Sequence, residues 1–550
     1  MVSFVGRGAD TPGLSDRMFR QRVRVVTVSA RRKGTWDPVA DRHTVRIRRP
    51  PHGGRHESHL PSGRTRRGPR PRAPPRLLAA GRRHGRRPRR SPADPTIPAD
   101  QTEATRTDRV AQAARIVPVA SVAALRTALG RAQPGDRIEL ADGVHTTTSP
   151  ILVPRSGTAA APVTVAAAHL GRAEITGTAG FAFGSGVSHV VVEGFRFTHT
   201  AGIEVPAGSA FVRLTRNVVR LAGSTQYWVT VAGDDCELDH NLFQHKSTLG
   251  NFVEVVGPGS GMAQRVLVHH NHFLDHSYRG GNGGEAIRFG LSGRQHASAR
   301  GRIENNLFER CDGDLEVVSV KSSDNVVRYN TLLNCQGTIT LRHGNRTRVE
   351  GNLLLGGAGG IRVYGDDHVV VDNVVQNSGY PALSVGGGEI VDDTGSTTDH
   401  ERADRLLAAF NTFVGAGPLV VFGGGKKYGP RTVTLANTIL LGTGGGALVQ
   451  VKQGSELTFA GNIAWSGTPG MPAGGYRQVD PRLVRDATGL YRPAAGSPAI
   501  DGAVGAYPQV GLDLDGQVRG GRKDVGADET GAPGATRGPL TPADVGPTGP

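Results

Sequence analysis

An asparagine followed by apolar residues recurs along most of this 550-residue chain. The copies are RNVV at Asn217, HNLF at Asn241, HNHF at Asn271, NNLF at Asn306, YNTLL at Asn330, GNLLL at Asn352, DNVV at Asn373, FNTFV at Asn411, ANTIL at Asn437 and GNIAW at Asn462. Six of the nine spacings lie between 21 and 26 residues, and we interpret the longer ones as one repeat plus a loop insertion. A helical solenoid needs about 33–47 residues per repeat. Short β-branched strands in shorter units predict an all-β fold, a right-handed parallel β-helix.

The repeated asparagines have a structural explanation. Asparagine tolerates a left-handed backbone at a sharp corner, and stacked side-chain amides can hydrogen-bond along the coil axis. Cys311 and Cys335 are 24 residues apart, which is one rung. We expect them to stack inside the coil as small apolar residues, with a disulfide as the less favoured alternative.

A single helix is expected before the strands begin. The segment SVAALRTALGRAQPGD has an N-cap candidate in Ser121, an apolar stripe, and a stop at Pro134-Gly135. The stripe consists of Leu125, Ala128 and Leu129. A short N-terminal capping helix would cover the open end of the coil and hide unpaired strand edges.

The net charge of +17 comes from one end of the chain. Residues 1–100 hold 25 basic and 7 acidic side chains, whereas residues 101–550 hold 40 and 41. The segment 1–110 is rich in Arg and Pro, so we expect it to be disordered or to be a mispredicted start. A nucleic-acid-binding function would rest on these residues alone. The β-helix domain is expected over 115–530, followed by a flexible tail over 531–550.

Composition excludes several other classes. No stretch approaches 18 apolar residues, which argues against a membrane-spanning helix. Three cysteines exclude a disulfide scaffold and a multi-cysteine zinc module. No secretion signal is visible in the sequence.

Acidic and amide side chains gather in two neighbouring repeats. Asp314 and Glu316 are two residues apart, so on one strand both point to the same face. Two adjacent carboxylates are costly to bury unless a cation neutralises them. With Asn282 from the Gly-rich segment RGGNGGEAIRFG they would form an all-oxygen site suited to Ca²⁺.

Two basic residues have the spacing of one rung. Arg342 lies 21 residues beyond Lys321, so the two are expected on adjacent rungs, roughly 5 Å apart. Two cations beside a carboxylate-held metal would form a strongly polarised anion site. The alternative interpretation is a solvated face of ion pairs.

The runs NNLFERCDGDLEVVSVKSSDN and NTLLNCQGTITLRHGN, with NGGEAIR before them, resemble polysaccharide lyase family six. That family contains alginate lyases and chondroitinase B, the dermatan sulfate lyase. The tail LDLDGQVRGGRKDVGADE also resembles a closing segment common in such β-helix proteins. The likeness covers residues ~115 to ~530.

The resemblance implies a secreted enzyme that cleaves uronate polysaccharides by Ca²⁺-assisted β-elimination. It implies Asn282, Asp314 and Glu316 as calcium ligands, Lys321 as the Brønsted base and Arg342 as the Brønsted acid. The family typically has Glu where this chain has Asp314, which is one methylene shorter but still an oxygen ligand.

Four further residues are candidates for substrate binding. Arg288 and Arg362 would hold substrate carboxylates. His343 would orient Arg342 or bind sugar, and His368 would line the groove or act as a hydrogen-bonded corner residue. The tract LVHHNHF resembles a metal site by composition, with His270 and His272 on one strand face and His269 on the other, but zinc is disfavoured there.

We therefore expect a monomeric polysaccharide lyase whose partner is an anionic polysaccharide, without nucleic-acid or membrane partners. Alginate is the first choice of substrate, because most members of the family resemble alginate lyases. The near-neutral charge of residues 101–550 leans mildly the same way, since a sulfated chain would favour extra basic residues. Dermatan sulfate is the second choice. A non-catalytic glycan-binding β-helix would also keep the asparagine repeat, but it would not need Lys321 and Arg342 one rung apart.

Overall fold

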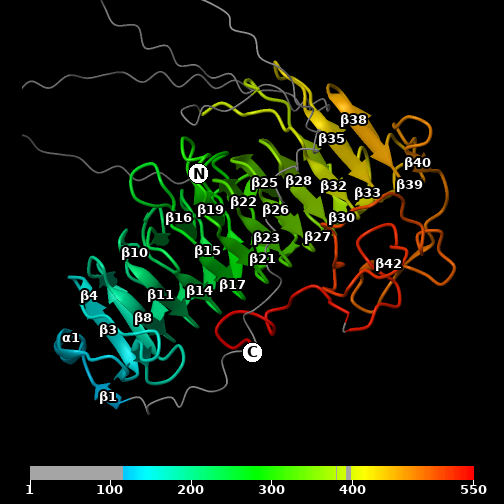
Figure 1. The fold of residues 1–550 in the computed structure, drawn as a ribbon. Helices are drawn as coiled ribbons and strands as arrows, with labels where there is room; N and C mark the ends of the chain where they lie inside the picture. The colour runs from blue at the N-terminus through cyan, green and yellow to red at the C-terminus, as the bar shows by residue number, and fades with distance from the viewer. Residues whose placement is uncertain (1–114, 380, 392–397, 535) are drawn as a thin grey trace, which may run out of the picture. The chain divides into compact units, whose positions relative to one another are not determined.

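The structure is a computed structural model that describes residues 115–379, 381–391, 398–534 and 536–550. The segment 1–110, expected to be disordered or mispredicted, lies outside the described residues. The described part of the chain forms a right-handed parallel β-helix of stacked rungs, in which most rungs contribute one strand to each of three parallel sheets (Figure 1). This confirms the predicted fold class.

Sheets A, B and C follow one another around each rung. Sheet A consists of β1 (Arg115–Val119), β2 (Asp136–Leu140), β5 (Val163–Ala167), β8 (Ser188–Glu193), β11 (Ala210–Thr215), β14 (Glu237–Asp239), β17 (Leu267–His269), β20 (Arg302–Glu304), β23 (Val326–Arg328), β26 (Arg348–Glu350), β29 (Val369–Val371), β32 (Leu407–Ala409), β35 (Arg431–Ala436) and β38 (Ser455–Ala460). Sheet B consists of β3 (Gly143–Thr147), β6 (Ala173–Gly177), β9 (Arg196–Phe197), β12 (Val218–Val219), β15 (Leu242–Lys246), β18 (His272–His276), β21 (Leu307–Cys311), β24 (Thr331–Leu333), β27 (Leu353–Leu355), β30 (Val374–Ser378), β33 (Thr412–Gly415), β36 (Ile439–Gly442), β39 (Asn462–Trp465) and β40 (Tyr476–Arg477). Sheet C consists of β4 (Ile151–Val153), β7 (Phe181–Phe183), β10 (Ile203–Val205), β13 (Val229–Val231), β16 (Val253–Val255), β19 (Ile287–Gly290), β22 (Glu316–Lys321), β25 (Thr338–His343), β28 (Ile361–Val363), β31 (Leu383–Val385), β34 (Val420–Phe422) and β37 (Val449–Val451). A separate antiparallel pair, β41 (Leu483–Arg485) and β42 (Tyr491–Pro493), follows the coil.

The interior of the coil is filled by equivalent side chains from successive rungs. Phe243, Phe273 and Phe308 are register partners on sheet B, and their rings stack with centroids 5.0 and 4.9 Å apart. Cys311 and Cys335 are buried free thiols, and the Cys311 amide donates to Cys335 Sγ at 3.4 Å. The predicted stacking of these cysteines is confirmed, and they form no disulfide.

The asparagines form a hydrogen-bonded ladder between sheets A and B. Asn306 Nδ2, for example, donates to Asn330 Oδ1 at 3.0 Å, and the pattern continues rung by rung from Asn217 to Asn411. The next position is taken by Thr438 rather than Asn437, because Thr438 accepts from the Asn411 amide and its own amide donates to Asn462. The assignment of Asn437 to the ladder was therefore wrong by one residue.

The left-handed corner also lies one residue away from its expected place. The residues just before the ladder positions have positive φ, among them Arg216, His240, His270, Asn305 and Tyr329. Asn437, with φ of 46°, occupies this corner position in its own rung. The ladder asparagines were expected to adopt the strained corner, but they supply the amides beside it.

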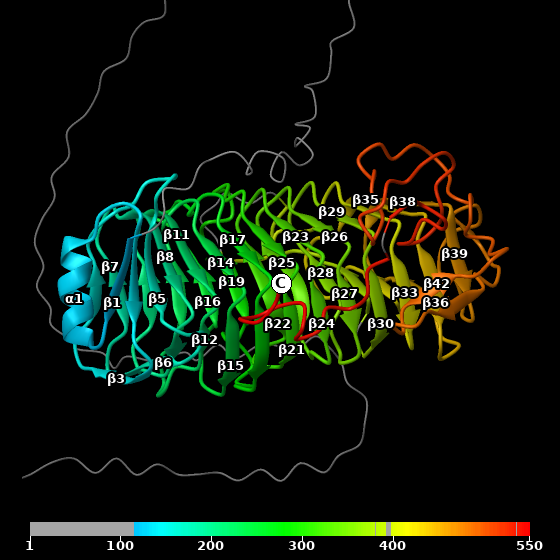
Figure 2. The same cartoon turned by 90° about the horizontal axis from the view of Figure 1, so that it is seen from below.

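A single helix covers the first rungs, as predicted. The helix α1 (Val122–Arg131) begins after Ser121, whose hydroxyl accepts from the Ala124 amide at 3.2 Å. Leu125 and Leu129 are fully buried against the coil. Figure 2 shows α1 at the end of the coil where β1 and β3 lie. No helix in the described residues is long and apolar enough to cross a membrane.

The residues after the coil fold back onto it. Arg519 is fully buried and pairs with Asp372 at 2.7 Å and Glu529 at 3.1 Å. Residues 536–550, part of the segment 531–550 that was expected to be a flexible tail, lie along the coil near β21 and β24 (Figure 2). Arg537 donates to the Tyr329 carbonyl at 2.8 Å, and Arg216 donates to the Pro547 carbonyl at 2.8 Å. These contacts attach the C-terminal residues to the corners of the rungs at Tyr329 and Arg216.

Candidate active site

The predicted catalytic residues lie on two neighbouring strands of sheet C. Lys321 ends β22 and Arg342 lies near the end of β25, so the two are on adjacent rungs as expected. The residue directly opposite Lys321 is His343, because the register shifts after the pair Val320 and Leu341. Arg342 is the extra residue of this β-bulge. A bulge turns a side chain away from the regular alternation of the strand, and bulges are common beside active sites.

Lys321 is a nearly buried amine beside a buried carboxylate. Its side chain is 10% exposed, and its Nζ lies 3.4 Å from Oε1 of Glu285. Glu285 itself is 2% exposed and accepts from Asn251 Nδ2 at 2.9 Å. The amine is therefore held in one place at the surface of sheet C.

Arg342 is held by the carboxylate of Glu316 on the neighbouring rung. Arg342 Nη1 lies 2.7 Å from Glu316 Oε1, and Ser319 Oγ donates to Glu316 Oε2 at 2.5 Å. Burial opposes ionisation of Glu316, but the guanidinium groups of Arg342 and Arg362 hold its pKa below the usual value. The Glu316 carboxylate therefore remains charged and fixes Arg342.

Asp314 has a different environment from Glu316. It lies in the turn before β22 rather than on the strand, and its Oδ2 accepts from the amides of Gly283 and Gly284 at 2.5 and 3.3 Å. Burial, followed by the charges of Glu285 and Glu316, raises the pKa of its carboxyl. The expectation that both acids share a strand was wrong, because β22 begins only at Glu316.

Asn282 is exposed in the turn that precedes Gly283, the residue whose amide binds Asp314. The structure thus places the Asn282 segment next to Asp314 through the backbone. Three carboxylates, Glu285, Asp314 and Glu316, interact here, and the hydrogen bonds to Asp314 come from backbone amides. Glu285 and Glu316 already pair with Lys321 and Arg342, so a divalent cation bound by oxygen ligands would chiefly compensate the charge of Asp314.

Arg288 and Arg362 lie on the outward-facing row of sheet C. The register pairs Arg288 with Ser319, Ser319 with Thr340, and Thr340 with Arg362. Arg362 contacts the same acid as Arg342, with Nη1 3.8 Å from Glu316 Oε1. Arg288 is already paired with Glu254 and donates to the Tyr227 hydroxyl at 3.0 Å. Both guanidinium groups therefore line the predicted face.

The two histidine candidates lie below the surface. His343 is 3% exposed and has its Nε2 3.3 Å from Ser292 Oγ. His368 is 1% exposed, its Nδ1 accepts from the Thr347 amide at 3.0 Å, and its Nε2 lies 2.9 Å from the Tyr364 carbonyl. Because backbone groups use both ring nitrogens of His368, its expected role in substrate binding is wrong and the corner interpretation holds.

Two aromatic side chains pack beside Arg342 and Arg362. The Tyr364 and His400 rings stack with centroids 4.3 Å apart, and the His343 and His400 rings stack at 5.7 Å. Arg362 donates from Nε to the Tyr364 hydroxyl at 3.1 Å. His400 comes from the long connection between β31 and β32, so this connection packs against the site.

Four residues of this site were missed from the sequence: Glu285, Ser319, Tyr364 and His400. Glu285 belongs to the motif NGGEAIR, and Ser319 lies two residues before Lys321, so the same alternation used for Asp314 and Glu316 would have found Ser319. Tyr364 follows Arg362 at the same spacing. His400 lies within a loop insertion, where rung spacing carries no information.

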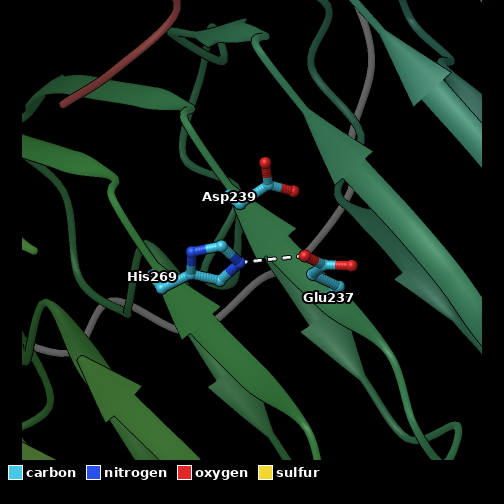
Figure 3. A group of neighbouring side chains, drawn as sticks. All are labelled: Glu237, Asp239 and His269. Atoms are coloured by element: carbon cyan, nitrogen blue, oxygen red, sulfur yellow. Dashed lines mark hydrogen bonds and ion pairs between the residues drawn. The ribbon is translucent and has the colours of Figure 1, made fainter. Parts of the chain in front are cut away.

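A separate acidic and histidine cluster lies on sheet A. Figure 3 shows Glu237, Asp239 and His269, with His269 Nε2 2.9 Å from Glu237. Asp239 already accepts two hydrogen bonds from Arg213, each at 2.7 Å. His269 lies beside His270, with their Nδ1 atoms 2.7 Å apart, whereas His272 pairs with Glu309 on sheet B. The predicted grouping of His270 with His272 was wrong, because the corner at His270 interrupts the strand alternation.

Comparison with known proteins identifies the family. A family model described as chondroitinase B matches residues 119–440, more than half of the chain. The chain resembles the solved structure of AlyGC, an alginate lyase of polysaccharide lyase family six, with 26% identity and a TM-score of 0.63. The match covers 69% of this chain and 55% of AlyGC, so this chain spans about half the length of that relative.

Two further solved structures share the fold. A mannuronic acid specific family 6 lyase from human gut microbiota has 24% identity and a TM-score of 0.58, with 66% of this chain and 91% of that one covered. The family lyase Pedsa3628 from Pseudopedobacter saltans has 20% identity and a TM-score of 0.55, with 78% and 99% covered. The search of curated protein sequences gave no match. The chain belongs to the chondroitinase B family, which is polysaccharide lyase family six.

Proposed function

We propose that this protein is a lyase that cleaves alginate by β-elimination and leaves 4,5-unsaturated uronate ends. The observation that carries the proposal is the pair of fixed basic side chains on adjacent rungs of sheet C. Lys321 is held at Glu285, and Arg342 is held at Glu316. The relatives named above are alginate or polysaccharide lyases, which supports the same chemistry here.

Lys321 is the proposed base. The C5 proton of a 4-linked uronate is α to a carboxylate, and its removal creates an enolate-like anion. An amine that is 10% exposed and anchored at one oxygen can be aimed at a single proton of a bound sugar. The C5 proton moves to Nζ of Lys321 in its neutral amine form, a double bond forms between C4 and C5, the C4–O4 bond breaks, and the leaving O4 takes a proton from Arg342 or from water.

Arg342 is proposed to stabilise the leaving O4. Its guanidinium projects from a bulge beside the strand end that carries Lys321. A fixed cation at the position where negative charge develops lowers the barrier more than a mobile one, because no reorganisation is needed during reaction. Arg362, on the next rung, is proposed to bind a substrate carboxylate.

Asn282, Asp314 and Glu316 are proposed to hold Ca²⁺. When bound, the ion would neutralise the uronate carboxylate and so acidify the C5 proton. The raised pKa of Asp314 and the neighbouring carboxylates support the binding of a cation here. The shorter side chain of Asp314 is fixed by hydrogen bonds from two backbone amides.

Dermatan sulfate is the second candidate substrate, because the matching family model is that of chondroitinase B. A secreted location, a monomeric state and a Ca²⁺ requirement remain predictions of the family resemblance. All three belong to the same proposal of an enzyme acting on an extracellular polyanion.

The test is absorbance near 235 nm on alginate, dermatan sulfate and polygalacturonate, with and without EDTA. We expect a rise on alginate that EDTA abolishes and Ca²⁺ restores. Lys321→Ala should lower kcat by at least about a thousandfold while the circular dichroism spectrum is unchanged. Absence of a rise on every polymer at any Ca²⁺ level would disprove the lyase proposal. Substantial activity of Lys321→Ala would disprove the base assignment.

A further inference from the structure

A cavity of about 400 Å³ opens on the turns between sheets B and C, outside the residues assigned above. Its lining includes Arg196, Arg220, His245 and Lys246. Among the described residues that line it there is no aspartate or glutamate. A concave site with cationic groups and no acid in its wall is complementary to an anion.

Lys246 is the distinctive group of this pocket. Its side chain is 1% exposed, and Nζ donates to the Thr225 carbonyl at 2.8 Å and to Thr248 Oγ1 at 3.1 Å. Its Nζ also lies 5.2 Å from the centre of the Trp228 ring. Burial lowers the pKa of Lys246 to about 8, because its neutral partners Thr225 and Thr248 do not compensate the lost hydration of the amine. An anion in the pocket would supply that compensation.

The two arginines at the pocket are more accessible than Lys246. Arg196 and Arg220 are exposed, and Arg196 has only a long contact of 3.7 Å with Glu174, which does not line the pocket. His245 is paired with Asp275 at 3.0 Å. Two guanidinium groups are therefore available at the mouth for bidentate contact with a carboxylate.

The pocket lies on the same stack of turns as the candidate active site. The Ser277 amide donates to the Lys246 carbonyl, and the Asp312 amide donates to the His276 carbonyl, so Lys246 lies two rungs before the turn that carries Asp314. The Gly250 amide donates to the Gly283 carbonyl, and the Gly283 amide donates to Asp314. Arg220 lies one rung and Arg196 two rungs further back than Lys246, so at ~4.8 Å per rung the pocket residues are roughly 10–19 Å from Asp314 along the coil axis.

We infer that this pocket binds the carboxylate of a further uronate residue in the same polysaccharide chain, a few sugars away from the bond that is cleaved. The inference rests on the proposed function, since the chain bound in the pocket is the same polysaccharide that the candidate active site cleaves. A polymer lying along the turn stack would reach Arg196, Arg220 and Lys246, whereas the shortest cleavable oligosaccharide would not. The pocket then gives the enzyme a preference for long chains.

The test compares chain lengths in a double variant, Arg196→Ala with Arg220→Ala. We expect kcat/KM on polymeric alginate to fall about tenfold, the worth of one charge-assisted contact, with no change on the shortest oligosaccharide that the wild type cleaves. Lys246→Met, which keeps the buried stem and removes the charge, should give the same pattern. Arg172→Ala, an exposed arginine that does not line the pocket, is the matched control. An equal fall on both substrates, or no fall on the polymer, would overturn the inference.

Calorimetric binding of an alginate hexasaccharide to Lys321→Ala separates the two proposals. Affinity for the alginate hexasaccharide should weaken about tenfold when Arg196 and Arg220 are also replaced, and a neutral hexasaccharide should not bind. This result supports anion binding in the pocket even if the wild type cleaves no polymer. Binding that is unaffected by these replacements overturns the pocket, and the lyase proposal then depends on the absorbance assay alone.

Discussion

The carboxylate of Glu285 is the closest charged partner of Lys321, and the two belong to different rungs. Their separation of 3.4 Å, with both side chains nearly buried, leaves the amine few alternative positions. Asn251, from the rung before, holds the other oxygen of Glu285 at 2.9 Å. Glu285 is thus a positioning residue for the proposed base, and it acts through Lys321 rather than through the substrate.

Replacing Glu285 with Gln keeps the shape of the side chain and removes its charge. We expect Glu285→Gln to lower kcat by about 10–100-fold and to leave KM within about twofold, because a displaced amine affects proton abstraction more than sugar binding. Steady-state kinetics on alginate measure both values. Glu309→Gln, the same change on sheet B of the following rung, is the control and should leave both unchanged. An unaltered kcat in Glu285→Gln would show that Lys321 is positioned by other groups.

At the scale of the elements, the asparagine ladder joins one rung to the next. The Asn306 side chain donates to Asn330 Oδ1 and to the Val268 carbonyl, and it accepts from the Asn271 amide and side chain. Asn306→Ala leaves several of these buried groups without a partner, which should lower the free energy of unfolding by about 2–4 kcal/mol. Chemical unfolding followed by circular dichroism measures this loss.

The control for the ladder is Gln336→Ala, which truncates an exposed amide. Its free energy of unfolding should stay within about 0.5 kcal/mol of the wild type, as for most surface substitutions. If Asn306→Ala were equally mild, the ladder would be a consequence of the coil rather than a contributor to its stability.

The rungs could be predicted from the sequence because every rung repeats the same corner and the same alternation of inward-facing and outward-facing side chains. It failed at ANTIL, where Asn437 looks like the asparagine of FNTFV. In the structure Val504 binds both the oxygen and the nitrogen of the Asn437 amide. That contact joins residues 67 positions apart, and no local pattern reports it.

The candidate site was likewise predictable where it lies on regular repeats, and not where it depends on bulges or insertions. Rung spacing placed Lys321 and Arg342 on adjacent strands, since both belong to regular repeats. The bulges at Val317 and Arg342 are shifts of hydrogen-bond register. Such shifts have no signature in the residue types, so the sequence did not predict them. His400 reaches the site from an insertion, so its position depends on the path of the loop.

On the scale of the whole molecule, the coil buries many histidines in neutral form. Burial lowers the pKa of His199, His270, His276 and His368 to about 4. Two buried acids act in the opposite direction, since burial raises the pKa of Asp372 to about 7 and that of Asp528 to about 6. The buried histidines and the buried acids therefore oppose one another, and their balance determines how the coil responds to acid.

The sign of the histidine contribution follows from proton binding. An unfolded histidine titrates near 6.5, so between pH 6.5 and 4 the unfolded chain binds more protons than the folded one and stability falls as the pH falls. Each such histidine should lower the free energy of unfolding by about 2 kcal/mol between pH 7.5 and 5. The buried histidines therefore favour unfolding in weak acid, whereas the raised pKa values of Asp372 and Asp528 oppose it.

His368 offers the sharpest test, because its Nδ1 accepts a backbone hydrogen bond and cannot be protonated while that bond exists. His368→Gln removes the titrating group, so its unfolding free energy should fall by about 2 kcal/mol less than that of the wild type between pH 7.5 and 5. Urea unfolding at the two pH values measures the difference. The exposed His169, replaced in the same way, should leave the pH dependence of the wild type intact. An identical pH dependence in His368→Gln and wild type would mean that His368 becomes protonated without unfolding, through a local opening of the corner between Tyr364 and Thr347.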